Sequence, residues 1–515
     1  MNYDLAINNA LIIDGTGSAP VLGSVGIQNG TIVNVLHHHD PLTATDVIDV
    51  GGNVLSPGFV DLHSHADFSL PTNPEAITQI TQGVTTLLTG NCGFSPFPVE
   101  DPATLQTATA FLGSDLDWSW RTANGFTAAL HHKAPTVSAV LQVGHGALRI
   151  ATMGTAQRAP TKSELSRMCD LLAEAAEQDI RGFSTGLIYS PGSYAASAEI
   201  ETLAQVAAEY DLLYSTHMRN ESDTVLEAVA EAISVARTTG VRLEISHLKA
   251  MGPRNHGKVN QALQLIDEAR DDGVDVATDV YPYAASSTTL TSRLPGWALD
   301  GGIAALLQRL NDPEQRQHIS SALSKRFDGE IDPAGIVLAE LPDGPYSGWI
   351  GRSLVDIAKA LATTAHDGAL DVLAAHQASV GIINHAMSDT DVETVLRYPH
   401  TAVASDGGIL TARGAGSPHP RSFGTFPRVL GHYVRERHLL SLEDAIRKMT
   451  SLPASRAGLT DRGRIAGGLA ADLTIFDPLA INDRSTYTDP WQMSVGVQHV
   501  LIGGRLVLYN GQVIA

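Results

Sequence analysis

PGFVDLHSH, residues 57–65, joins a short apolar run to two histidines that lie two positions apart. In a β-strand, residues two apart point to the same face, so the imidazoles of His63 and His65 can point at one spot. Neutral imidazole is a common zinc ligand. An isolated H-x-H pair is weak support for a metal site, because two polar loop residues would look the same. Its place directly after an apolar strand that begins at Pro57-Gly58 strengthens the prediction.

Eight further segments repeat this plan of an apolar run that ends in polar residues, and helical patterns such as 163–178 and 223–240 lie between them. The segments are 83–93, 138–146, 181–189, 212–220, 241–249, 274–283, 381–388 and 401–408. Alternating strands and helices favour a parallel sheet. Polar residues at the carboxyl ends of the strands are typical of the active-site face of a (β/α)₈ barrel.

Nine candidate strands are one too many for such a barrel, so one is misassigned or belongs to an insertion. The rhythm breaks between about 285 and 345, where we expect an inserted segment that could act as a lid. The two ends of the chain differ from the middle, with short alternating apolar runs separated by turn residues such as Asn29-Gly30 and Asn510-Gly511. We therefore expect residues 1–57 and 460–515 to form one small β-domain and residues 58–459 to form the barrel.

Composition narrows the class of protein. The 515 residues include 34 basic and 55 acidic side chains, a formal net charge of −21. Such a charge argues against a nucleic-acid or anionic-membrane partner. Two cysteines make no disulfide framework, no signal-peptide pattern is visible, and no apolar run reaches the roughly 18 residues of a membrane span. We expect a cytoplasmic protein.

Four more strand-end residues can carry metal or proton chemistry. They are Cys92, His217, His247 and Asp406. Each has an ordinary alternative: a buried inert thiol, a structural histidine, or an aspartate in a turn before glycine. A nucleophilic cysteine paired with a histidine is a sharper rival. Their recurrence at equivalent strand ends, beside the H-x-H pair, instead favours a metal centre in which the carboxylate also accepts a proton.

These motifs resemble the amidohydrolase superfamily and, more closely, the N-acyl-D-amino-acid deacylases, also called D-aminoacylases. The resemblance spans nearly the whole chain. It is carried by GNCGFSP, VGHGALR, GFSTGLIYSPGSYA, STHMRNES, ISHLKAMG, HPRSFGTFPRVL and DRGRIAGGLAADLTIFDP. The motifs GNCGFSP and GFSTGLIYSPG are specific to that branch, whereas PGFVDLHSH and ADLTIFDP occur across the superfamily.

The resemblance implies a (β/α)₈ barrel with a small β-sandwich made from both termini and an insertion late in the barrel. It implies a tightly bound zinc on Cys92, His217 and His247. It also implies a weaker second metal site on His63, His65 and Asp406, with Cys92 in place of the carboxylated lysine of many relatives. The implied reaction is hydrolysis of the amide bond of an N-acyl-D-amino acid, with Asp406 as the proton carrier.

Recognition of the substrate carboxylate needs cations and hydroxyl groups near the strand ends. The candidates are Lys249, Arg293, Arg413, Tyr189, Tyr281 and Tyr283, of which the resemblance favours Tyr189, Lys249, Tyr281 and Arg293. Arg413 is expected to contact the α-carboxylate or an acidic side chain. Arg421 and His145 are expected to hold active-site loops. A cyclic-amide substrate, as in hydantoinases and dihydropyrimidinases, is the main alternative, and an inactive structural relative is another.

Overall fold

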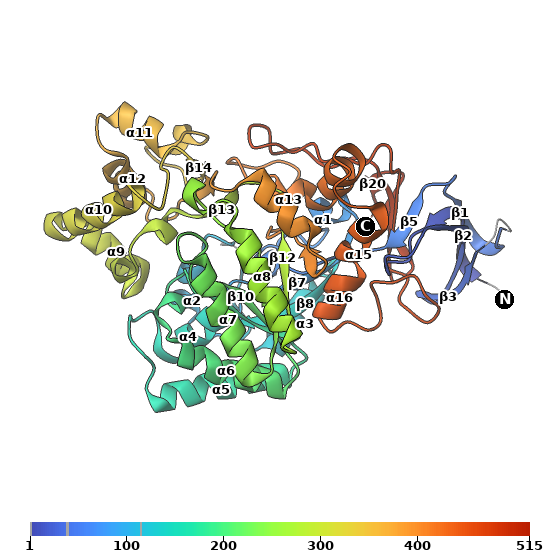
Figure 1. Ribbon diagram of the computed structural model, residues 1–515, viewed down its shortest axis with the longest axis horizontal. Coiled ribbons are helices and arrows are strands. Elements are labelled where there is room, and N and C mark those ends of the chain that lie inside the picture. The colour runs from blue at the N-terminus through green and yellow to red at the C-terminus, as the bar shows by residue number, and fades with distance from the viewer. Residues whose placement is uncertain (1–2, 38–40, 114–115, 515) are drawn as a thin grey trace.

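An eight-stranded parallel sheet forms the centre of the computed structural model, which describes residues 3–37, 41–113 and 116–514 (Figure 1). The order of strands in this sheet follows their order in the chain. The strands are β6 (Phe59–Asp61), β7 (Val84–Thr89), β8 (Ser138–Gly144), β9 (Gly182–Gly186), β10 (Leu213–His217), β11 (Arg242–Ile245), β12 (Val276–Val280) and β16 (Thr401–Val403). Sequential parallel neighbours of this kind are the strand arrangement of a (β/α)₈ barrel.

The first and last strands meet and bring the barrel close to full closure. Ser64 forms a parallel bridge with Gly407 just beyond the ends of β6 and β16. The backbone N–H of Asp406 donates to the carbonyl of His63 at 2.8 Å, and that of His65 donates to the carbonyl of Gly407 at 2.8 Å. The sequence prediction of a (β/α)₈ barrel is therefore confirmed, and the closing contacts lie at the residues that carry the predicted chemistry.

Helices make the crossovers between the parallel strands, as such pairing requires. Those before the last strand are α1 (Ile77–Ile80), α2 (Pro102–Thr109), α3 (Ala123–His132), α4 (His145–Met153), α5 (Lys162–Ala176), α6 (Ser197–Glu209), α7 (Val225–Thr239), α8 (Lys258–Asp271) and α13 (Asp389–Arg397). The helices that follow the last barrel strand are α14 (Arg421–Arg428), the π-helix η7 (Val429–Glu436), α15 (Leu442–Met449) and α16 (Ser451–Arg456). No helix in the described part of the chain has both the length and the apolar character needed to cross a bilayer.

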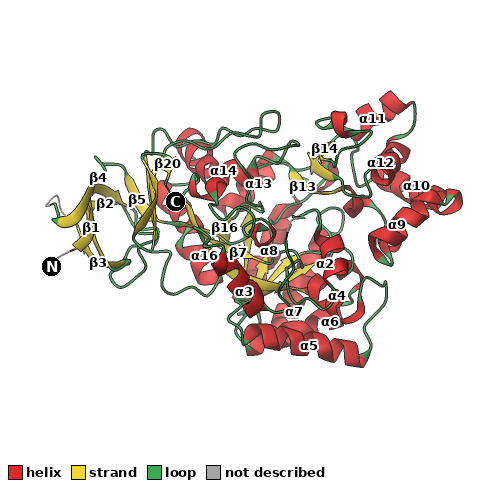
Figure 2. Cartoon of the chain, turned by 180° about the vertical axis from the view of Figure 1, so that it is seen from behind, coloured by secondary structure: helices red, strands yellow, loops and turns green. Residues whose placement is uncertain are grey.

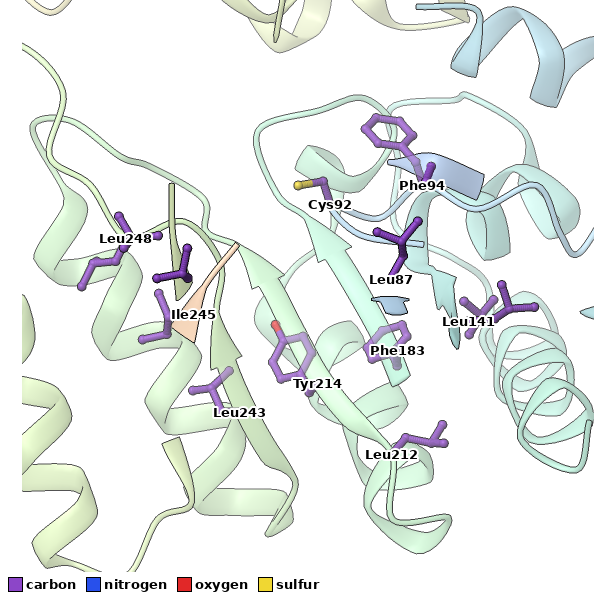
Figure 3. Packing of buried hydrophobic residues seen from close by; sticks show 14 of the residues in the cluster. Leu87, Cys92, Phe94, Leu141, Phe183, Leu212, Tyr214, Leu243, Ile245 and Leu248 are labelled. Carbon is purple, nitrogen blue, oxygen red and sulfur yellow. The ribbon is translucent and has the colours of Figure 1, made fainter. Parts of the chain in front are cut away.

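Local sequence explains where these helices begin and end. Thr161 and Glu164 form a reciprocal capping box at the start of α5, which satisfies two backbone N–H groups that have no partner within the helix. Gly240 ends α7 in the left-handed conformation at φ 74°, which costs glycine little. Strands such as β9 and β10 are buried at every residue and hence on both faces. Figure 3 shows Phe183, Tyr214 and Leu243, which neighbouring strands bring together on one of these faces. Continuous burial explains why the strands read as apolar runs rather than alternating ones.

A second sheet joins the two ends of the chain. Its strands are β1 (Tyr3–Ile12), β2 (Val21–Gln28), β3 (Thr31–Leu36), β4 (Ala44–Asp49), β5 (Val54–Pro57), β17 (Leu473–Phe476), β18 (Val497–Ile502), β19 (Arg505–Tyr509) and β20 (Gln512–Val513). The amino- and carboxyl-terminal parts meet where β5 pairs with β17. A core that includes Ile7, Ile27 and Ile475 draws on both ends, which confirms the prediction of a small β-domain built from both termini.

An inserted segment between β12 and β16 has a sheet and a hydrophobic core of its own, far from the terminal β-domain (Figures 1 and 2). Its elements are β13 (Ser286–Thr289), α9 (Gly302–Asn311), α10 (Pro313–Phe327), β14 (Ile336–Glu340), α11 (Leu354–Leu361), α12 (Ala365–Ala375) and β15 (Gly381–Asn384). The ninth candidate strand, 381–388, starts with β15 and thus belongs to this antiparallel sheet. The observed segment continues well past residue 345, because β15 must return to pair with both β13 and β14.

Candidate active site

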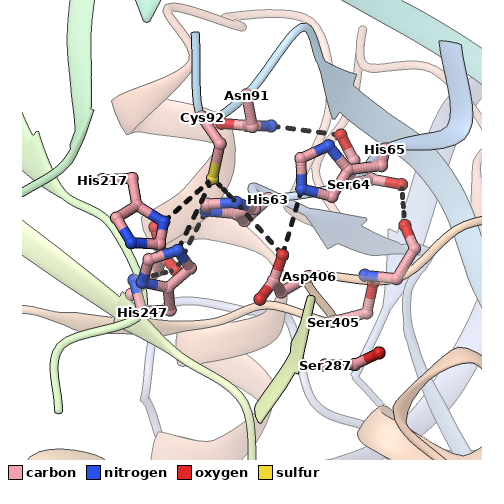
Figure 4. A network of polar contacts seen from close by, with 12 residues as sticks. His63, Ser64, His65, Asn91, Cys92, His217, His247, Ser287, Ser405 and Asp406 are labelled. Atoms are coloured by element: carbon pink, nitrogen blue, oxygen red, sulfur yellow. Dashed lines mark hydrogen bonds and ion pairs between the residues drawn. The ribbon is translucent and has the colours of Figure 1, made fainter. Parts of the chain in front are cut away.

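A cavity of about 400 Å³ lies at the carboxyl ends of the barrel strands, and the inserted segment supplies one of its walls. Six of the residues singled out in the sequence gather here, from five strand ends. His63 and His65 follow β6, Cys92 follows β7, His217 is the last residue of β10, His247 follows β11 and Asp406 follows β16. Figure 4 shows their side chains converging on one point. This is the face on which (β/α)₈ barrels carry their active sites.

Three of these residues have a backbone conformation that non-glycine residues rarely adopt. The φ angles of Cys92, His247 and Asp406 are 55°, 36° and 51°. Such left-handed residues cost free energy and persist only where the surroundings hold them in place. Each one lies two or three residues beyond the end of a strand, where the chain turns, and its side chain lines the cavity. Backbone strain at three converging residues is typical of a functional site.

The loop that carries Cys92 packs against the ends of the next two strands. A side chain at Gly186 would bring its Cβ within 1.9 Å of the Cys92 carbonyl oxygen. A side chain at Gly144 would bring its Cβ within 2.4 Å of Gly93. Glycine at both strand ends therefore permits the close approach that sets the position of the thiol.

The Cys92 sulfur lies at the centre of three imidazoles. Its distance is 3.3 Å to Nε2 of His63, 3.6 Å to Nδ1 of His217 and 3.5 Å to Nε2 of His247. Tetrahedral zinc, with bonds of about 2.0–2.1 Å to nitrogen and about 2.3 Å to sulfur, separates neighbouring ligand atoms by roughly 3.3–3.6 Å. The observed spacings therefore suit ligands of a shared metal ion, and a thiolate at this place could bridge two ions.

The protonation states of Cys92 and His247 also suit a metal. Burial alone would raise the pKa of the Cys92 thiol, but His63 and His217 lower it well below its ordinary value, which favours the thiolate. Burial and the Lys249 ammonium lower the pKa of His247 to about 3, so its ring is neutral. A thiolate and a neutral imidazole are the forms in which cysteine and histidine bind zinc. Although burial lowers it, Glu221 and Cys92 raise the pKa of His217 to about 9, so zinc would have to displace a proton from that ring. The donor set therefore fits zinc in spacing and in the kind of ligand atoms it offers.

Two overlapping groups of side chains in this cluster have the compact arrangement of metal ligands. One comprises His63, Cys92, His247 and Asp406, and the other comprises His217, Glu221 and His247. His65 joins the first group through Asp406, whose Oδ1 lies 3.1 Å from Nε2 of His65. The Cys92 sulfur therefore has the ligand atoms of one group and those of the other close to it.

Asp406 is held by an arginine on one side and faces the histidines on the other. The Arg421 guanidinium donates to Oδ2 of Asp406 at 2.7 Å, while Oδ1 lies 3.5 Å from Nε2 of His63. Burial would raise the pKa of Asp406, but Arg421 and His65 lower it well below its ordinary range. The carboxylate is therefore ionised and oriented, with Oδ1 turned towards the metal-ligand cluster.

Two acidic residues of the site were missed in the sequence. Glu221 places Oε2 at 3.4 Å from Nε2 of His217 and Oε1 at 3.1 Å from Nδ1 of His247. Asp279 places Oδ1 at 3.4 Å from Nδ1 of His63. Carboxylates that contact the outer nitrogens of histidine ligands fix ring orientation. The available signals were the four-residue spacing of His217 and Glu221 and the position of Asp279 in an apolar strand.

Four of the expected substrate-binding residues line the cavity, namely Tyr189, Lys249, Tyr281 and Arg293. Lys249 donates to Glu221 at 2.5 Å, and the hydroxyl groups of Tyr189 and Thr288 lie 3.0 Å apart. Arg293 is buried, and no partner is found for its guanidinium in the described part of the chain.

The other sequence candidates lie farther out. Arg413 is exposed in the loop after Asp406 and is not among the residues that line the cavity. Tyr283 also lies outside the lining and packs its ring under the Arg428 guanidinium at 4.9 Å. The ring of His145 is buried at the start of α4, where Nε2 lies 2.8 Å from the Glu199 carboxylate. Arg421 instead contacts Asp406 directly and also donates to the Ser287 carbonyl on the insertion at 3.2 Å.

Comparisons with known proteins identify the family of this chain. The model of the amidohydrolase family matches residues 46–508. An N-acyl-D-glutamate deacylase from Alcaligenes xylosoxydans xylosoxydans is 37% identical over an alignment that covers 98% of this chain and 93% of the relative. A D-aminoacylase from the same organism is 32% identical and covers 98% of this chain and 94% of its own.

Solved structures give the same family. The N-acyl-D-glutamate deacylase of Bordetella bronchiseptica, in complex with zinc and a phosphonate mimic of the tetrahedral intermediate, superimposes with a TM-score of 0.84 at 35% identity, covering 98% of this chain and 97% of that one. A D-aminoacylase gives 0.85 at 32% identity, with 99% and 98% covered. An Arthrobacter aurescens hydantoinase, at 16% identity and a TM-score of 0.55, shares the fold alone. The chain belongs to the amidohydrolase family, in the branch of the N-acyl-D-amino-acid deacylases, or D-aminoacylases.

Proposed function

We propose that this protein is a zinc-dependent hydrolase that cleaves the amide bond of N-acyl-D-amino acids and releases a carboxylate and a free D-amino acid. The observation that carries the proposal is the Cys92 thiolate, which lies at metal-ligand spacing from two imidazoles beside the ionised carboxylate of Asp406. A ligand set and a proton acceptor within one cavity are what metal-assisted amide hydrolysis needs.

The ligands divide into two sets around the sulfur. Cys92, His217 and His247 would hold the tightly bound zinc, with Glu221 contacting the outer nitrogens of both rings. His63, His65 and Asp406 would hold a second, more weakly bound metal, and the Cys92 sulfur lies within 3.3 Å of Nε2 of His63 on that side. Zinc held by Cys92, His217 and His247 would polarise the acyl carbonyl and lower the pKa of water at the site.

Asp406 is proposed to move the proton. Its Oδ1 accepts a proton from the attacking water as the new C–O bond forms at the acyl carbon. The same carboxyl then delivers that proton to the amide nitrogen as the C–N bond breaks, because an amine leaves readily whereas an amide anion does not. Arg421 holds Oδ2 at 2.7 Å during both transfers and so orients the carboxylate.

The carboxylate of the substrate is proposed to bind at the Arg293 and Lys249 side of the cavity. A buried guanidinium without a partner is costly, and a substrate carboxylate would relieve that cost through two charge-assisted hydrogen bonds. Tyr281 and Tyr189 line the same region and can add hydroxyl donors. Arg413, expected from the sequence to bind a carboxylate, would need its loop to turn inwards.

Preference for the D-series is supported by the relatives, which are named as N-acyl-D-glutamate deacylase, N-acyl-D-aspartate deacylase and D-aminoacylase. The deciding experiment incubates the zinc-loaded protein with paired N-acetyl-D- and L-amino acids and, separately, with hydantoin and dihydrouracil. We expect hydrolysis of the D-acyl compounds and slow or no turnover of the rest. Faster turnover of a cyclic amide than of every acyl compound would overturn the proposal.

We also propose that the protein acts on a small molecule and has no nucleic-acid or membrane partner. Its proposed location is the cytoplasm. Both cysteines, Cys92 and Cys169, are free thiols, which suits a reducing compartment. Fractionation of the source cells, with activity followed in the cytosolic and membrane fractions, tests the location.

A further inference from the structure

The charges that line the cavity are matched except for two. Its lysine and arginine residues are Lys249, Arg293 and Arg421, and its acidic residues are Glu221, Glu340 and Asp406. Lys249 pairs with Glu221 at 2.5 Å, and Arg421 pairs with Asp406 at 2.7 Å. Among the described residues, neither Arg293 nor Glu340 has an ion-pair or hydrogen-bond partner for its charged group. Counted over the residues that the structure describes, the cavity therefore presents one free cation and one free anion.

Both free charges are carried by the inserted segment. Arg293 ends the short 3₁₀ turn that directly follows β13, and Glu340 is the last residue of β14. The Glu340 side chain is exposed at the edge of the cavity, and neighbouring protein shields its carboxyl only in part, which raises its pKa. An acid in such a position gains from a cationic or hydrogen-bond-donating partner.

Strand pairing places Glu340 in line with two other residues of the cavity wall. Thr289 of β13 pairs with Gly381 of β15, and Gly381 pairs with Glu340 of β14. The register of β14 shifts between Leu338 and Glu340, but a Cβ built at Gly381 would lie 3.0 Å from the Cβ of Glu340, so Glu340 points to the same face as Gly381. Two strand spacings separate Thr289 from Glu340 by about 10 Å. All three residues line the cavity.

Gly381, which lies between Thr289 and Glu340 on the middle strand, has no side chain and leaves a gap. A side chain at Gly381 would place its Cβ 3.0 Å from the Cβ of Glu340 and would fill the space between the two outer strands. Because position 381 is glycine, the sheet face is open from Thr289 to Glu340. An extended substrate side chain can lie in this open strip and end at the carboxylate.

We infer that the free charges select an N-acyl-D-amino acid whose side chain ends in a cation, such as D-lysine, D-ornithine or D-arginine. The inference rests on the proposed function. Arg293 takes the α-carboxylate, so the amino-acid half of the substrate lies beside the insertion and its side chain reaches Glu340. An acidic side chain would instead bring a second carboxylate towards Glu340, and repulsion would reject it.

The test compares three substrates of similar length: N-α-acetyl-D-lysine, N-acetyl-D-norleucine, which has the same chain without the ammonium, and N-acetyl-D-glutamate. For the zinc-loaded wild-type protein we expect kcat/KM for the lysine compound to exceed that for the glutamate compound by about tenfold or more, as expected for one charge-assisted hydrogen bond. A preference for the glutamate compound would overturn the inference.

Variants at position 340 sharpen the test. In E340Q, the ratio of kcat/KM for the lysine compound to that for norleucine should fall about tenfold. In E340K the preference should turn towards the glutamate compound. The matched control is E314Q, in the first turn of α10 on the same insertion but outside the cavity lining, and it should leave the ratio unchanged.

The outcomes separate this inference from the proposed function. If E340Q lowers kcat/KM for all three compounds by the same factor, Glu340 has a structural role only, and the inference fails while the function stands. If the zinc-loaded wild-type protein hydrolyses other N-acetyl-D-amino acids but none of these three, the inference fails and the function stands. If it hydrolyses no N-acetyl-D-amino acid at all, the proposed function itself fails.

Discussion

The strand ends of the barrel and the inserted segment form two walls of one cavity, and their charges are arranged differently. On the barrel wall, each titratable side chain among the candidate metal ligands lies within 4 Å of another such side chain. Cys92 and His247, for example, are 3.5 Å apart. On the insertion wall, Arg293 and Glu340 have no such partner among the described residues. The side chains of the barrel wall are therefore already paired before substrate binds, whereas the charges of the insertion wall remain available to pair with substrate.

The largest effect is expected from Cys92→Ala. Loss of the thiolate removes the atom that three imidazoles share, so the protein should lose its zinc and essentially all turnover. Elemental analysis and hydrolysis of an N-acetyl-D-amino acid measure both. The second cysteine provides a control, since Cys169→Ala on α5 should keep zinc and activity. Full zinc content together with lost turnover in Cys92→Ala would instead favour a nucleophilic cysteine.

Asp406→Asn should separate metal binding from proton transfer. Removing a general base typically lowers kcat by about 10²–10⁴-fold. The Cys92, His217 and His247 ligands remain, so the tightly bound zinc should stay. Steady-state kinetics and metal analysis on one sample are the measurements. A kcat near that of the wild type would remove Asp406 from the mechanism.

Glu221→Gln probes the support behind the metal ligands. Glu221 contacts the outer nitrogens of His217 and His247 and pairs with Lys249. Loss of such an outer contact typically weakens metal affinity by about 10–100-fold. Competition with a zinc chelator of known affinity measures the change, and restored turnover at high zinc would show that the reaction chemistry is intact. Unchanged zinc affinity would show that Glu221 does not orient the rings.

Arg293→Met tests the insertion wall. Without the guanidinium, KM for an N-acetyl-D-amino acid should rise by about tenfold or more, the worth of a hydrogen bond to a charged group, while zinc content stays the same. An analogue in which hydrogen replaces the carboxylate should be hydrolysed equally by both proteins. A KM unaffected by the substitution would move the carboxylate site elsewhere.

The smallest effect is expected from Arg413→Ala. The side chain is exposed and lies outside the cavity lining, and substitutions at such positions usually change energies by no more than about 0.5 kcal/mol, or about twofold in kcat/KM. This result would leave Arg293 as the carboxylate partner. A tenfold rise in KM would instead show that the loop turns inwards and that Arg413 binds substrate, as expected from the sequence.

The sequence was most informative where one strand end carries one chemical group. The order of apolar runs was enough to predict the barrel, and His63, His217 and His247 stood out because each follows such a run. Sequence could not show that Arg421 contacts Asp406, because that pair depends on how α14 packs over the barrel end. The contact between Glu221 and His217 could not be predicted for the same reason. It forms only when the loop after β10 folds back and brings the two side chains together.

The insertion was the hardest part to read from the sequence. Its sheet brings together strands that are distant in the chain, with Thr289 next to Gly381 and Gly381 next to Glu340. Pairings of that range leave no local periodicity, so β15 looked like a barrel strand and the segment seemed to end near 345. Glu340 accordingly drew no attention, although it is one of the two free charges in the cavity.

The most direct test of the central claim is a zinc titration of the metal-free protein, with release of free amino acid from an N-acetyl-D-amino acid as the readout. We predict that activity rises from zero and reaches its maximum at about one zinc per chain, the occupancy of the Cys92, His217 and His247 site. Full activity in the metal-free protein, or no activity at any zinc concentration with any N-acetyl-D-amino acid, would contradict the account.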